Sequence, residues 1–212
     1  MHLKRQKTPK NWPIPRKGTA YVVRPNNNLK NSIPILIVLR DILKLAQNRK
    51  EVKKAIHSKH ILLNNRIVKD EKNPMLLFDL LSIVPSKKHY RMELSNKGKF
   101  QIKETETNKK ISKIINKKIL KGKKIQLNLS DGKNFLSDIK CHVNDSVLIN
   151  LKDKKIEKCI PLKEKAKIII IGGKHTGETG IINKINSERK ITESVINKKN
   201  VNVLIKQLMV IE

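Results

Sequence analysis

The sequence predicts an α+β fold built from several modules in series. A basic, proline-rich segment opens the chain. Apolar residues then recur at helical spacing and lead into a hairpin pattern, and short strand-like runs separated by turn residues fill the rest. We therefore expect an extended basic N-terminal arm (1–33), a small α/β domain (34–92), a central β-rich domain (93–160) and a small C-terminal β-barrel (161–212).

The charge of the chain predicts a polyanionic partner. The 212 residues include 48 Lys and Arg against 18 Asp and Glu, which gives a formal net charge of +30 and a pI near 10.3. The four predicted segments carry +8, +8, +9 and +5 in order, so the charge is not confined to one tail. Because a charge of this size opposes compaction unless a polyanion neutralises it, we expect the protein to bind nucleic acid.

The kind of cation indicates how nucleic acid would be bound. Of the 48 basic residues, 40 are Lys and 8 are Arg. Lys acts as a flexible point charge, whereas Arg presents a planar fork for paired contacts, so this balance favours neutralising phosphates over reading bases. An A/T-rich genome would produce the same bias toward Lys.

The composition argues against several other classes of protein. No stretch reaches the roughly 18 uncharged apolar residues of a membrane span, and no apolar leader opens the chain, so we expect neither a membrane protein nor a secreted precursor. Two Cys residues do not make a disulfide scaffold. His57 and His60, with Cys141-His142 and Cys159, lack the paired spacing of four zinc ligands, so we expect no metal.

An enzymatic role is not expected either. The stretch Gly172–Gly180 superficially suggests a nucleotide loop, but Gly177 is followed by Glu178 where a phosphate-binding loop needs Lys, and a strand is predicted to follow. No nucleophile-elbow or Ser-His-Asp signature is present. We therefore expect no catalytic residue and no cofactor.

The first 33 residues are predicted to form an arm rather than a packed domain. Residues 2–18 hold three Pro and six cations, and each Pro fixes φ and removes a backbone donor. We expect the arm to be extended and to order only on RNA. Trp12, the only Trp of the chain, has two interpretations. It stacks on a base or ribose of RNA, or it anchors the arm on the protein core.

Two helices are expected next. Pro34 suits a first helical turn that Asn31 or Ser32 would cap, and the apolar residues that follow recur at helical spacing up to Ala46. A second, shorter helix is expected over 51–56, with its Lys residues facing away from its apolar stripe.

A hairpin and a strand complete the second segment. Two apolar runs flank Asn64-Asn65 within 61–68, which is typical of a tight hairpin because Asn tolerates positive φ. Residues 78–84 are predicted to follow as a strand.

The last two segments are predicted to be rich in strands. In 93–160, strands are expected over 125–129 and in the run that follows the turn at 143–145, whereas the isoleucines of 111–119 fit a helix or a strand equally. In 161–212, the run 168–171, a glycine-rich loop and a strand over 201–210 predict a small barrel.

The motifs resemble those of one ribosomal protein family. Residues 39–85 resemble the S-four RNA-binding domain, and residues 168–185 resemble the KOW motif, a glycine-containing hairpin. In their order along the chain, these modules resemble the archaeal and eukaryotic small-subunit ribosomal protein family S-four-e. The residues that carry the resemblance are His2-Leu3-Lys4-Arg5, Pro9-Lys10-Asn11-Trp12, Pro34 to Leu39 with Arg40, Glu51-Val52-Lys53-Lys54, Phe78-Asp79 with Ser82-Ile83, and Val143-Asn144-Asp145.

The resemblance implies a structural constituent of the small ribosomal subunit that binds and stabilises its rRNA and supports translation. Its partners would be small-subunit rRNA and neighbouring small-subunit proteins, with no membrane and no homo-oligomer, in the cytoplasm within the ribosome. The RNA-binding candidates of the S-four unit are Arg40, Lys44, Lys50, Lys53, Lys54, Lys59 and Arg66. The further candidates are Lys4, Arg5, Lys7, Lys10, Trp12, Arg16 and Lys17 in the arm, and Lys174 and His175 in the glycine-rich loop.

Simpler interpretations and two other functions stay open. A helix Lys is often only a solvated charge, and the glycine-rich loop also fits an ordinary β-turn; Arg40 and Arg66 are favoured because Arg is scarce here and fits phosphate. An RNA-modifying enzyme with an S-four domain would need a separate catalytic domain, and 93–160 looks too short and too Lys-rich for one. A KOW-bearing transcription factor would be distinguished by binding to RNA polymerase.

Overall fold

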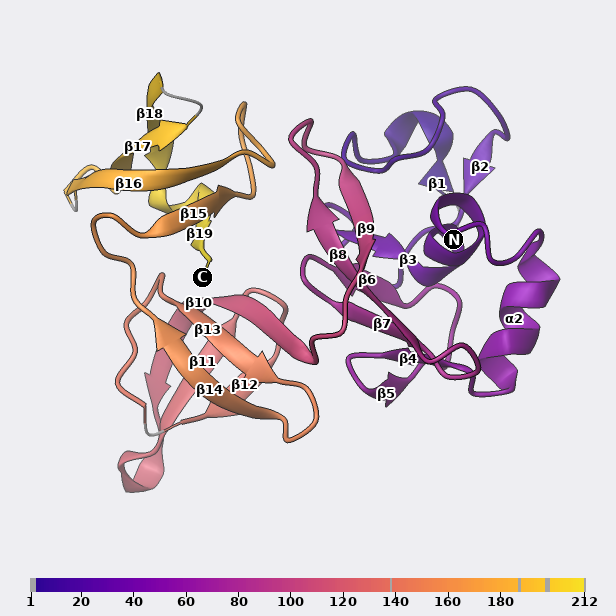
Figure 1. Cartoon of the computed structure of the whole chain (residues 1–212), viewed down its shortest axis with the longest axis horizontal. Coiled ribbons are helices and arrows are strands. Elements are labelled where there is room, and N and C mark those ends of the chain that lie inside the picture. The colour runs from indigo at the N-terminus through magenta and orange to yellow at the C-terminus, as the bar shows by residue number, and fades with distance from the viewer. Residues whose placement is uncertain (1–2, 138, 187, 197–198, 212) are drawn as a thin grey trace. The chain divides into compact units, whose positions relative to one another are not determined.

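The computed structural model of this chain is mostly β, with few helices (Figure 1). It describes residues 3–137, 139–186, 188–196 and 199–211; His2, part of the N-terminal motif, lies outside them. The chain divides into two compact units. Unit 1 comprises the residues up to Leu94 together with Lys99–Thr107, and unit 2 comprises Ser95–Gly98 together with the residues from Asn108 onward. The four-segment division predicted from the sequence is finer and stays a prediction.

Unit 1 combines small antiparallel sheets with a short buried helix. In the arm, β1 (Leu3–Lys4) pairs with β2 (Tyr21–Val22), and a 3₁₀ turn spans Arg5–Lys7. A second two-stranded sheet joins β3 (Ser32–Pro34) to β6 (Pro74–Leu76). The main sheet has the strand order β5-β4-β7-β8-β9 and consists of β4 (Ile61–Leu63), β5 (Arg66–Ile67), β7 (Leu80–Ile83), β8 (Lys88–Leu94) and β9 (Phe100–Glu104).

Both predicted helices are present, with different ends. The first consists of α1 (Ile35–Ile37) and a π-helical turn over Val38–Ile42, and it ends earlier than predicted because Lys44 adopts a φ of +53°. The second, α2 (Arg49–His57), begins two residues before the predicted start.

The cap predicted for the first helix is wrong. Pro34 precedes the helix and no side chain caps it. The hydroxyl of Ser32 instead donates to the carbonyls of Asn27 and Asn28, at 3.2 and 2.8 Å. Ser32 belongs to β3, so its side chain stabilises the loop before the strand rather than the helix after it.

The arm belongs to unit 1 and packs on the core of that unit. The prediction of an unpacked arm that orders only on RNA is therefore wrong. Leu3 and Trp12 lie in the same buried cluster as residues 35–39, and the helix is therefore buried on every side rather than along one stripe. The Trp12 side chain is 2% exposed, and its Nε1 donates to the Ser32 carbonyl over 2.9 Å. Of the two interpretations of Trp12, the structure shows the anchor.

The predicted hairpin is confirmed, and its turn has a second role. Asn64 and Asn65 adopt φ values of 51° and 58° between β4 and β5. The Asn64 amide also donates to the Asp79 carboxylate over 2.8 Å and accepts from the Leu80 backbone N–H over 3.0 Å. Asp79 accepts a further bond from the Leu76 N–H at 2.8 Å. This buried network ties the hairpin to β7.

Unit 2 contains two five-stranded antiparallel sheets, each with its own buried cluster (Figure 1). The first, with the order β12-β11-β10-β13-β14, consists of β10 (Lys109–Ile119), β11 (Ile125–Leu129), β12 (Asn134–Leu136), β13 (Ser146–Asn150) and β14 (Lys155–Ile160). The second, with the order β18-β17-β16-β15-β19, consists of β15 (Lys167–Ile170), β16 (Thr179–Asn186), β17 (Ile191–Ile196), β18 (Lys199–Leu204) and β19 (Leu208–Val210).

Two strand predictions are resolved in unit 2. Residues 111–119, which fitted a helix or a strand, belong to β10, whose first half pairs with β13 and whose second half pairs with β11. The β-branched isoleucines suit this pairing, and Ile111 lies opposite Leu148. The single strand predicted over 201–210 is interrupted by a 3₁₀ turn at Ile205–Gln207 that separates β18 from β19.

The Val143-Asn144-Asp145 motif has a structural role in unit 2. Asn144 adopts a φ of +76°, which turns the chain into β13. The buried Asp145 carboxylate accepts the His142 N–H at 2.8 Å and the Leu162 N–H at 2.9 Å. One side chain thus holds the segments on both sides of the β13–β14 hairpin.

Candidate nucleic-acid interface

Helix α2 presents a row of cations to solvent. Its first turn is fixed by Asn48, whose side chain accepts the Glu51 N–H at 3.0 Å, and Glu51 in return accepts the Gln47 N–H at 2.7 Å. Val52 and Ile56 are buried. The outer face holds four exposed side chains at helical spacing, namely Lys50, Lys53, Lys54 and His57.

The start of α2 is also held by an ion pair. Arg49 binds the buried carboxylate of Glu71, and this hydrogen bond raises the pKa of the guanidinium. Arg49 therefore neutralises a buried acid, whereas the lysines that follow it do not. No local pattern marks this role of Arg49, because its partner Glu71 lies 22 residues away along the chain.

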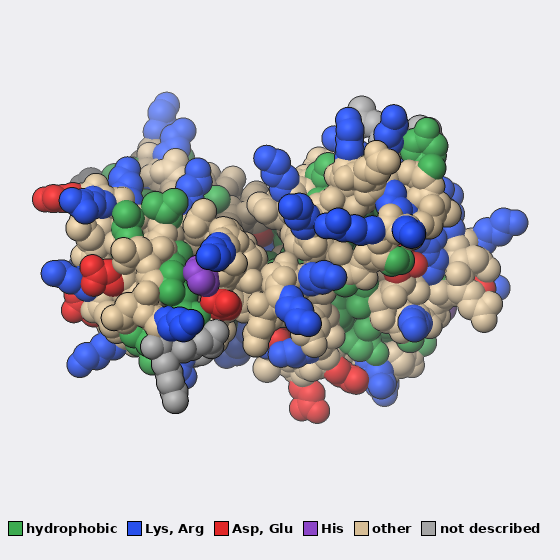
Figure 2. Space-filling view, turned by 90° about the horizontal axis from the view of Figure 1, so that it is seen from above, with side chains coloured by type: hydrophobic (Ala, Val, Ile, Leu, Met, Phe, Trp, Pro, Cys, Tyr) green, Lys and Arg blue, Asp and Glu red, His purple; other side chains and the backbone are tan. Residues whose placement is uncertain are grey.

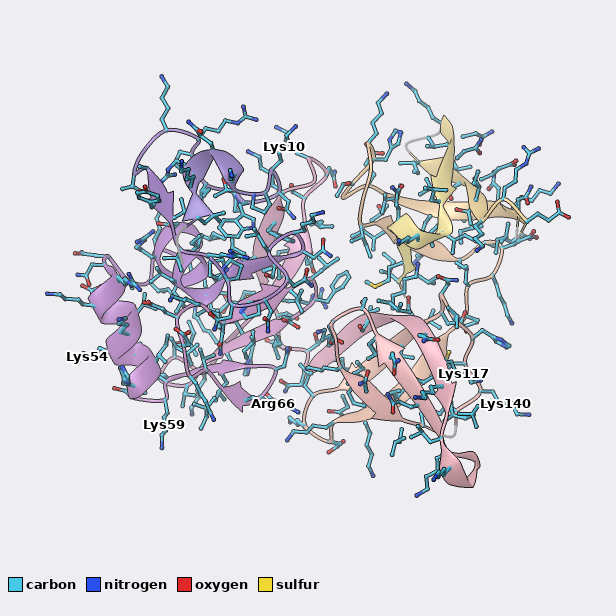
Figure 3. The ribbon with its side chains drawn as sticks, turned by 180° about the vertical axis from the view of Figure 1, so that it is seen from behind. Lys10, Lys54, Lys59, Arg66, Lys117 and Lys140 are labelled. Carbon is cyan, nitrogen blue, oxygen red and sulfur yellow. The ribbon has the colours of Figure 1, made fainter. Side chains whose placement is uncertain are left out.

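Lys59 and Arg66 extend this row of charge beyond the helix. Lys59 is exposed and lies just past the end of α2, and Arg66 is exposed on β5. In Figure 3, Lys54, Lys59 and Arg66 lie along the same side of unit 1, and Lys10 lies at the opposite end. We call the surface formed by six of these exposed side chains the helix–hairpin surface; they are Lys50, Lys53, Lys54, His57, Lys59 and Arg66.

Arg40 differs from the other candidates of this region. Its Nε and Nη2 donate to the two carboxylate oxygens of the adjacent Asp41, both at 2.9 Å. The hydrogen bond to Asp41 raises the pKa of Arg40. Because its charge is already compensated, Arg40 is a poorer phosphate ligand than its residue type indicated, whereas Lys44 is exposed nearby in the chain.

A second group of cations gathers on the arm. Figure 2 shows many Lys and Arg side chains over the face of unit 1 that carries β1 and β2. Five of the predicted candidates in the arm are exposed, and with Lys99 they form what we call the arm surface: Lys4, Lys7, Lys10, Arg16, Lys17 and Lys99. Lys99 was missed by sequence reasoning, because it comes from the chain just before β9 and only the fold brings it to the arm.

Arg5 is a structural side chain rather than an open cation. Its Nε donates to the Thr19 carbonyl at 2.7 Å, its Nη1 to the Pro15 carbonyl at 2.7 Å and its Nη2 to the Thr19 hydroxyl at 2.8 Å. Three of its five N–H groups thus hold the loop 15–19. Together with the buried Trp12, Arg5 shapes the arm and presents other residues.

The glycine-rich loop between β15 and β16 presents one open cation. Gly173 and Gly177 adopt φ values of 94° and 92°, conformations that favour glycine. His175 is half-buried, and its Nδ1 lies 2.9 Å from Glu178 Oε2. Lys174 is exposed at the tip. Of the two candidates in this loop, Lys174 is therefore the one suited to a phosphate.

Some lysines of unit 2 are inside the fold. Lys110 is 1% exposed and forms an ion pair of 2.6 Å with Asp131, which is 4% exposed. Although burial alone raises the pKa of Asp131, the charge of Lys110 brings that pKa below its ordinary value. Lys113 donates to the carbonyls of Ile205 and Leu208, and burial lowers the pKa of Lys113 to about 8. These charges contribute to the count of +30 but not to the surface.

Two other kinds of site, for a metal ion and for a membrane, are considered for the residues that the structure describes. Among them, no group of three or more His, Cys, Asp or Glu side chains is placed to hold a metal ion. In the same residues, none of the helices is long and apolar enough to cross a membrane.

The chain matches known proteins in sequence and in fold. Two family models match the chain, that of the Ribosomal family S4e over residues 86–156 and that of the RS4NT (NUC023) domain over residues 1–27. In fold, the chain is similar to the crystal structure of the 30S ribosomal protein S4e from Thermoplasma acidophilum, with a TM-score of 0.74 and 23% sequence identity over 86% of this chain and 95% of that chain.

Relatives in sequence point to the same family. The small ribosomal subunit protein eS4 of Methanothermobacter thermautotrophicus is 39% identical over 194 residues, which cover 89% of this chain and 80% of the relative. The protein of the same name from Nanoarchaeum equitans is 38% identical over 191 residues, which cover 87% of this chain and 82% of the relative. At this identity over most of both chains, the protein belongs to the S4e family of ribosomal proteins.

Proposed function

We propose that this protein is a structural constituent of the small ribosomal subunit that binds and stabilises small-subunit rRNA. The observation that carries the proposal is the helix–hairpin surface, where exposed cations follow one face of α2 and continue to Arg66. Membership in the S4e family supports the ribosomal location. The protein acts by neutralising phosphates and fixing RNA geometry, without turnover.

The proposal includes a finer architecture. Residues 39–85 serve as an S-four RNA-binding domain, supported by α2 and the hairpin of β4 and β5. Residues 168–185 serve as a KOW module, supported by the glycine-rich loop between β15 and β16. The arm surface adds a further RNA contact. The protein works in the cytoplasm within the ribosome, beside other small-subunit proteins.

The two other functions that the sequence left open lose support. Relatives 38–39% identical over most of both chains are small ribosomal subunit proteins, which favours the ribosomal role over an RNA-modifying enzyme or a transcription factor.

Sedimentation of a cell extract through a sucrose gradient tests the proposal. We expect the chain to co-migrate with the small subunit in a one-to-one ratio and to remain there at moderate salt. With about 6–10 phosphate contacts, the affinity of the free protein for rRNA should fall roughly 10³–10⁵-fold between 50 and 200 mM salt. A substoichiometric chain that washes off early, or one that never meets the small subunit, would contradict the structural role.

A further inference from the structure

A basic pocket opens beside the arm in unit 1. Its volume is about 490 Å³, which is in the range of ligand sites in proteins. Three parts of the chain line it: six residues within 5–12, the three residues 14–16, and Lys99. Four lining side chains are cations, Arg5, Lys10, Arg16 and Lys99, and none of the described residues that line it is acidic.

One wall of the pocket is fixed by Arg5. Its guanidinium bonds to Pro15 and Thr19, which holds the loop that carries Arg16 against the 3₁₀ turn. Gly18 makes this possible, because a Cβ at that residue would lie 3.1 Å from the guanidinium and the backbone has a φ of +140°. Arg16 is thus presented from a braced loop rather than from a free tail.

The other side of the pocket is fixed through Asn11. The Phe100 N–H donates to the Asn11 carbonyl over 2.8 Å, which places the preceding Lys99 next to the arm. Trp12 follows Asn11, and its buried indole anchors the segment through the bond to Ser32. Cations that lie far apart in sequence are therefore held around one cavity before any ligand arrives.

The lining is suited to a nucleotide rather than to a bare anion. Lys10, Arg16 and Lys99 supply positive charge for a phosphate. Pro9, Ile14 and Pro15, which also line the pocket, supply the apolar surface that a base requires. A pocket admits a base only when that base is unpaired, since in an A-form duplex the bases are stacked inside the helix.

We propose that this pocket binds an unpaired nucleotide of RNA, with its phosphate against Lys10, Arg16 and Lys99 and its base against the apolar lining. This inference rests on the proposed function, because it assigns one RNA contact of a protein that binds rRNA. It goes further in naming single-stranded RNA as the ligand and in separating the arm pocket from the helix–hairpin surface.

The chain carries its own probe of this pocket. Trp12 is the only Trp of the sequence and lines the cavity, so its fluorescence reports on a ligand that enters. The full-length chain is titrated with a single-stranded hexaribonucleotide, with a duplex of the same sequence and with inorganic phosphate. We expect a saturable change of Trp12 emission with the single strand at concentrations at least about tenfold below those that phosphate needs, and no change with the duplex.

Matched variants locate the signal. K10A combined with R16A should weaken the single-strand response at least about tenfold, as expected when charge-assisted phosphate contacts are lost. K152A combined with K155A removes the same number of exposed charges from unit 2, outside the proposed RNA-binding modules, and should leave the response unchanged. An unchanged emission maximum and unfolding midpoint show that each variant is folded.

Several results would overturn the inference. These are an unchanged response in the K10A/R16A variant, an equal response to the duplex, and a phosphate response at the same concentration as the single strand, which would mean a simple anion site. The proposed function fails separately. If the chain sediments with the small subunit but shows no Trp12 response, only the proposal of the pocket is contradicted. If the chain shows the response but never joins the subunit, only the ribosomal role is contradicted.

Discussion

Helix α2 and strand β10 use the same residue type in opposite ways. In α2, Lys50, Lys53 and Lys54 lie on the face opposite the buried Val52 and Ile56, and all three lysines are exposed. In β10, Lys110 and Lys113 are buried, one beside a carboxylate and one beside backbone carbonyls. The comparison teaches that a count of positive charge is not a count of RNA contacts. The three α2 lysines are exposed to a phosphate, whereas Lys110 and Lys113 stabilise the fold.

The largest effect is expected at the buried ion pair of β10. D131N would remove the carboxylate that lies 2.6 Å from the buried Lys110 ammonium, and breaking a buried ion pair typically costs about 3–5 kcal/mol. Urea unfolding of the full chain measures this loss. The matched change D153N removes an exposed carboxylate, whose one hydrogen bond comes from Asn150, and should cost about 0.5 kcal/mol. Equal losses from D131N and D153N would show that the buried pair is not a structural element.

The ion pair of Lys110 and Asp131 should make the stability of the fold depend on pH in the acid range. Lys110 holds the pKa of Asp131 below its ordinary value, so the folded state binds fewer protons at this site than the unfolded state. The stability from Asp131 is therefore complete above the unfolded pKa of about 3.9 and is lost as the pH falls through the folded pKa. D131N should lose this component of the acid dependence, and an identical acid limb in both proteins would contradict the assignment.

A reversal of charge on α2 should act on RNA binding instead of stability. K53E combined with K54E should lower the affinity for small-subunit rRNA by about tenfold or more and reduce the slope of log affinity against log salt by about 2. Filter binding at several salt concentrations measures both quantities, and unfolding should be unchanged within about 0.5 kcal/mol. K152E combined with K155E, two exposed lysines of unit 2 outside the proposed RNA-binding modules, serves as the control for net charge. Unchanged affinity of K53E/K54E at physiological salt would remove these residues from the interface.

Lys113 should give a smaller, pH-dependent effect. Burial lowers its pKa to about 8, below the unfolded value of about 10.4, so the folded state binds fewer protons in this range. Stability from this site therefore rises with pH, by about 1 kcal/mol between pH 7 and pH 9. Urea unfolding of the wild type and of K113M at both pH values isolates the contribution of Lys113 to stability, because K113M lacks the titrating group. The same rise in K113M would assign the effect to other groups.

The smallest effect is expected at Arg40. R66A should lower rRNA affinity by about tenfold, since Arg66 is exposed on the hairpin, whereas R40A should lower it by less than about threefold, since Arg40 is already paired with Asp41. Filter binding at one low salt concentration compares the two variants. If R40A had the larger effect, Arg40 would have to exchange Asp41 for a phosphate in the complex.

Much of the fold could be predicted because its signals are local. The apolar spacing of residues 51–56, the turn at Asn64-Asn65 and the alternation over 125–129 each mark an element that the structure contains. The ends of the first helix were harder. Ser32, a predicted cap, donates to the Asn28 carbonyl instead of capping the helix. The apolar residues predicted to form one stripe are buried on every side, because the arm packs against the same cluster.

The basic character of the candidate site could be predicted from the sequence, whereas the individual residues available to contact RNA were harder to predict. The lysines of α2 are exposed because helical spacing separates them from Val52 and Ile56. Arg5 and Arg40 were assigned to RNA from their residue type, but both are engaged by the protein. Lys99 was missed, because no pattern in the sequence connects it with Lys10 and Arg16.

The sequence by itself determined the polyanionic partner, the mostly local element pattern and the resemblance to a ribosomal family, since charge, periodicity and turn residues are all readable along the chain. Tertiary structure alone decided which cations are available. Asp131 reaches Lys110 from 21 residues away, Ser32 reaches Trp12 from 20, and Thr19 reaches Arg5 from 14. Burial and ion pairing depend on such long-range contacts, and the free energy of a charge follows its surroundings in space rather than its neighbours in sequence.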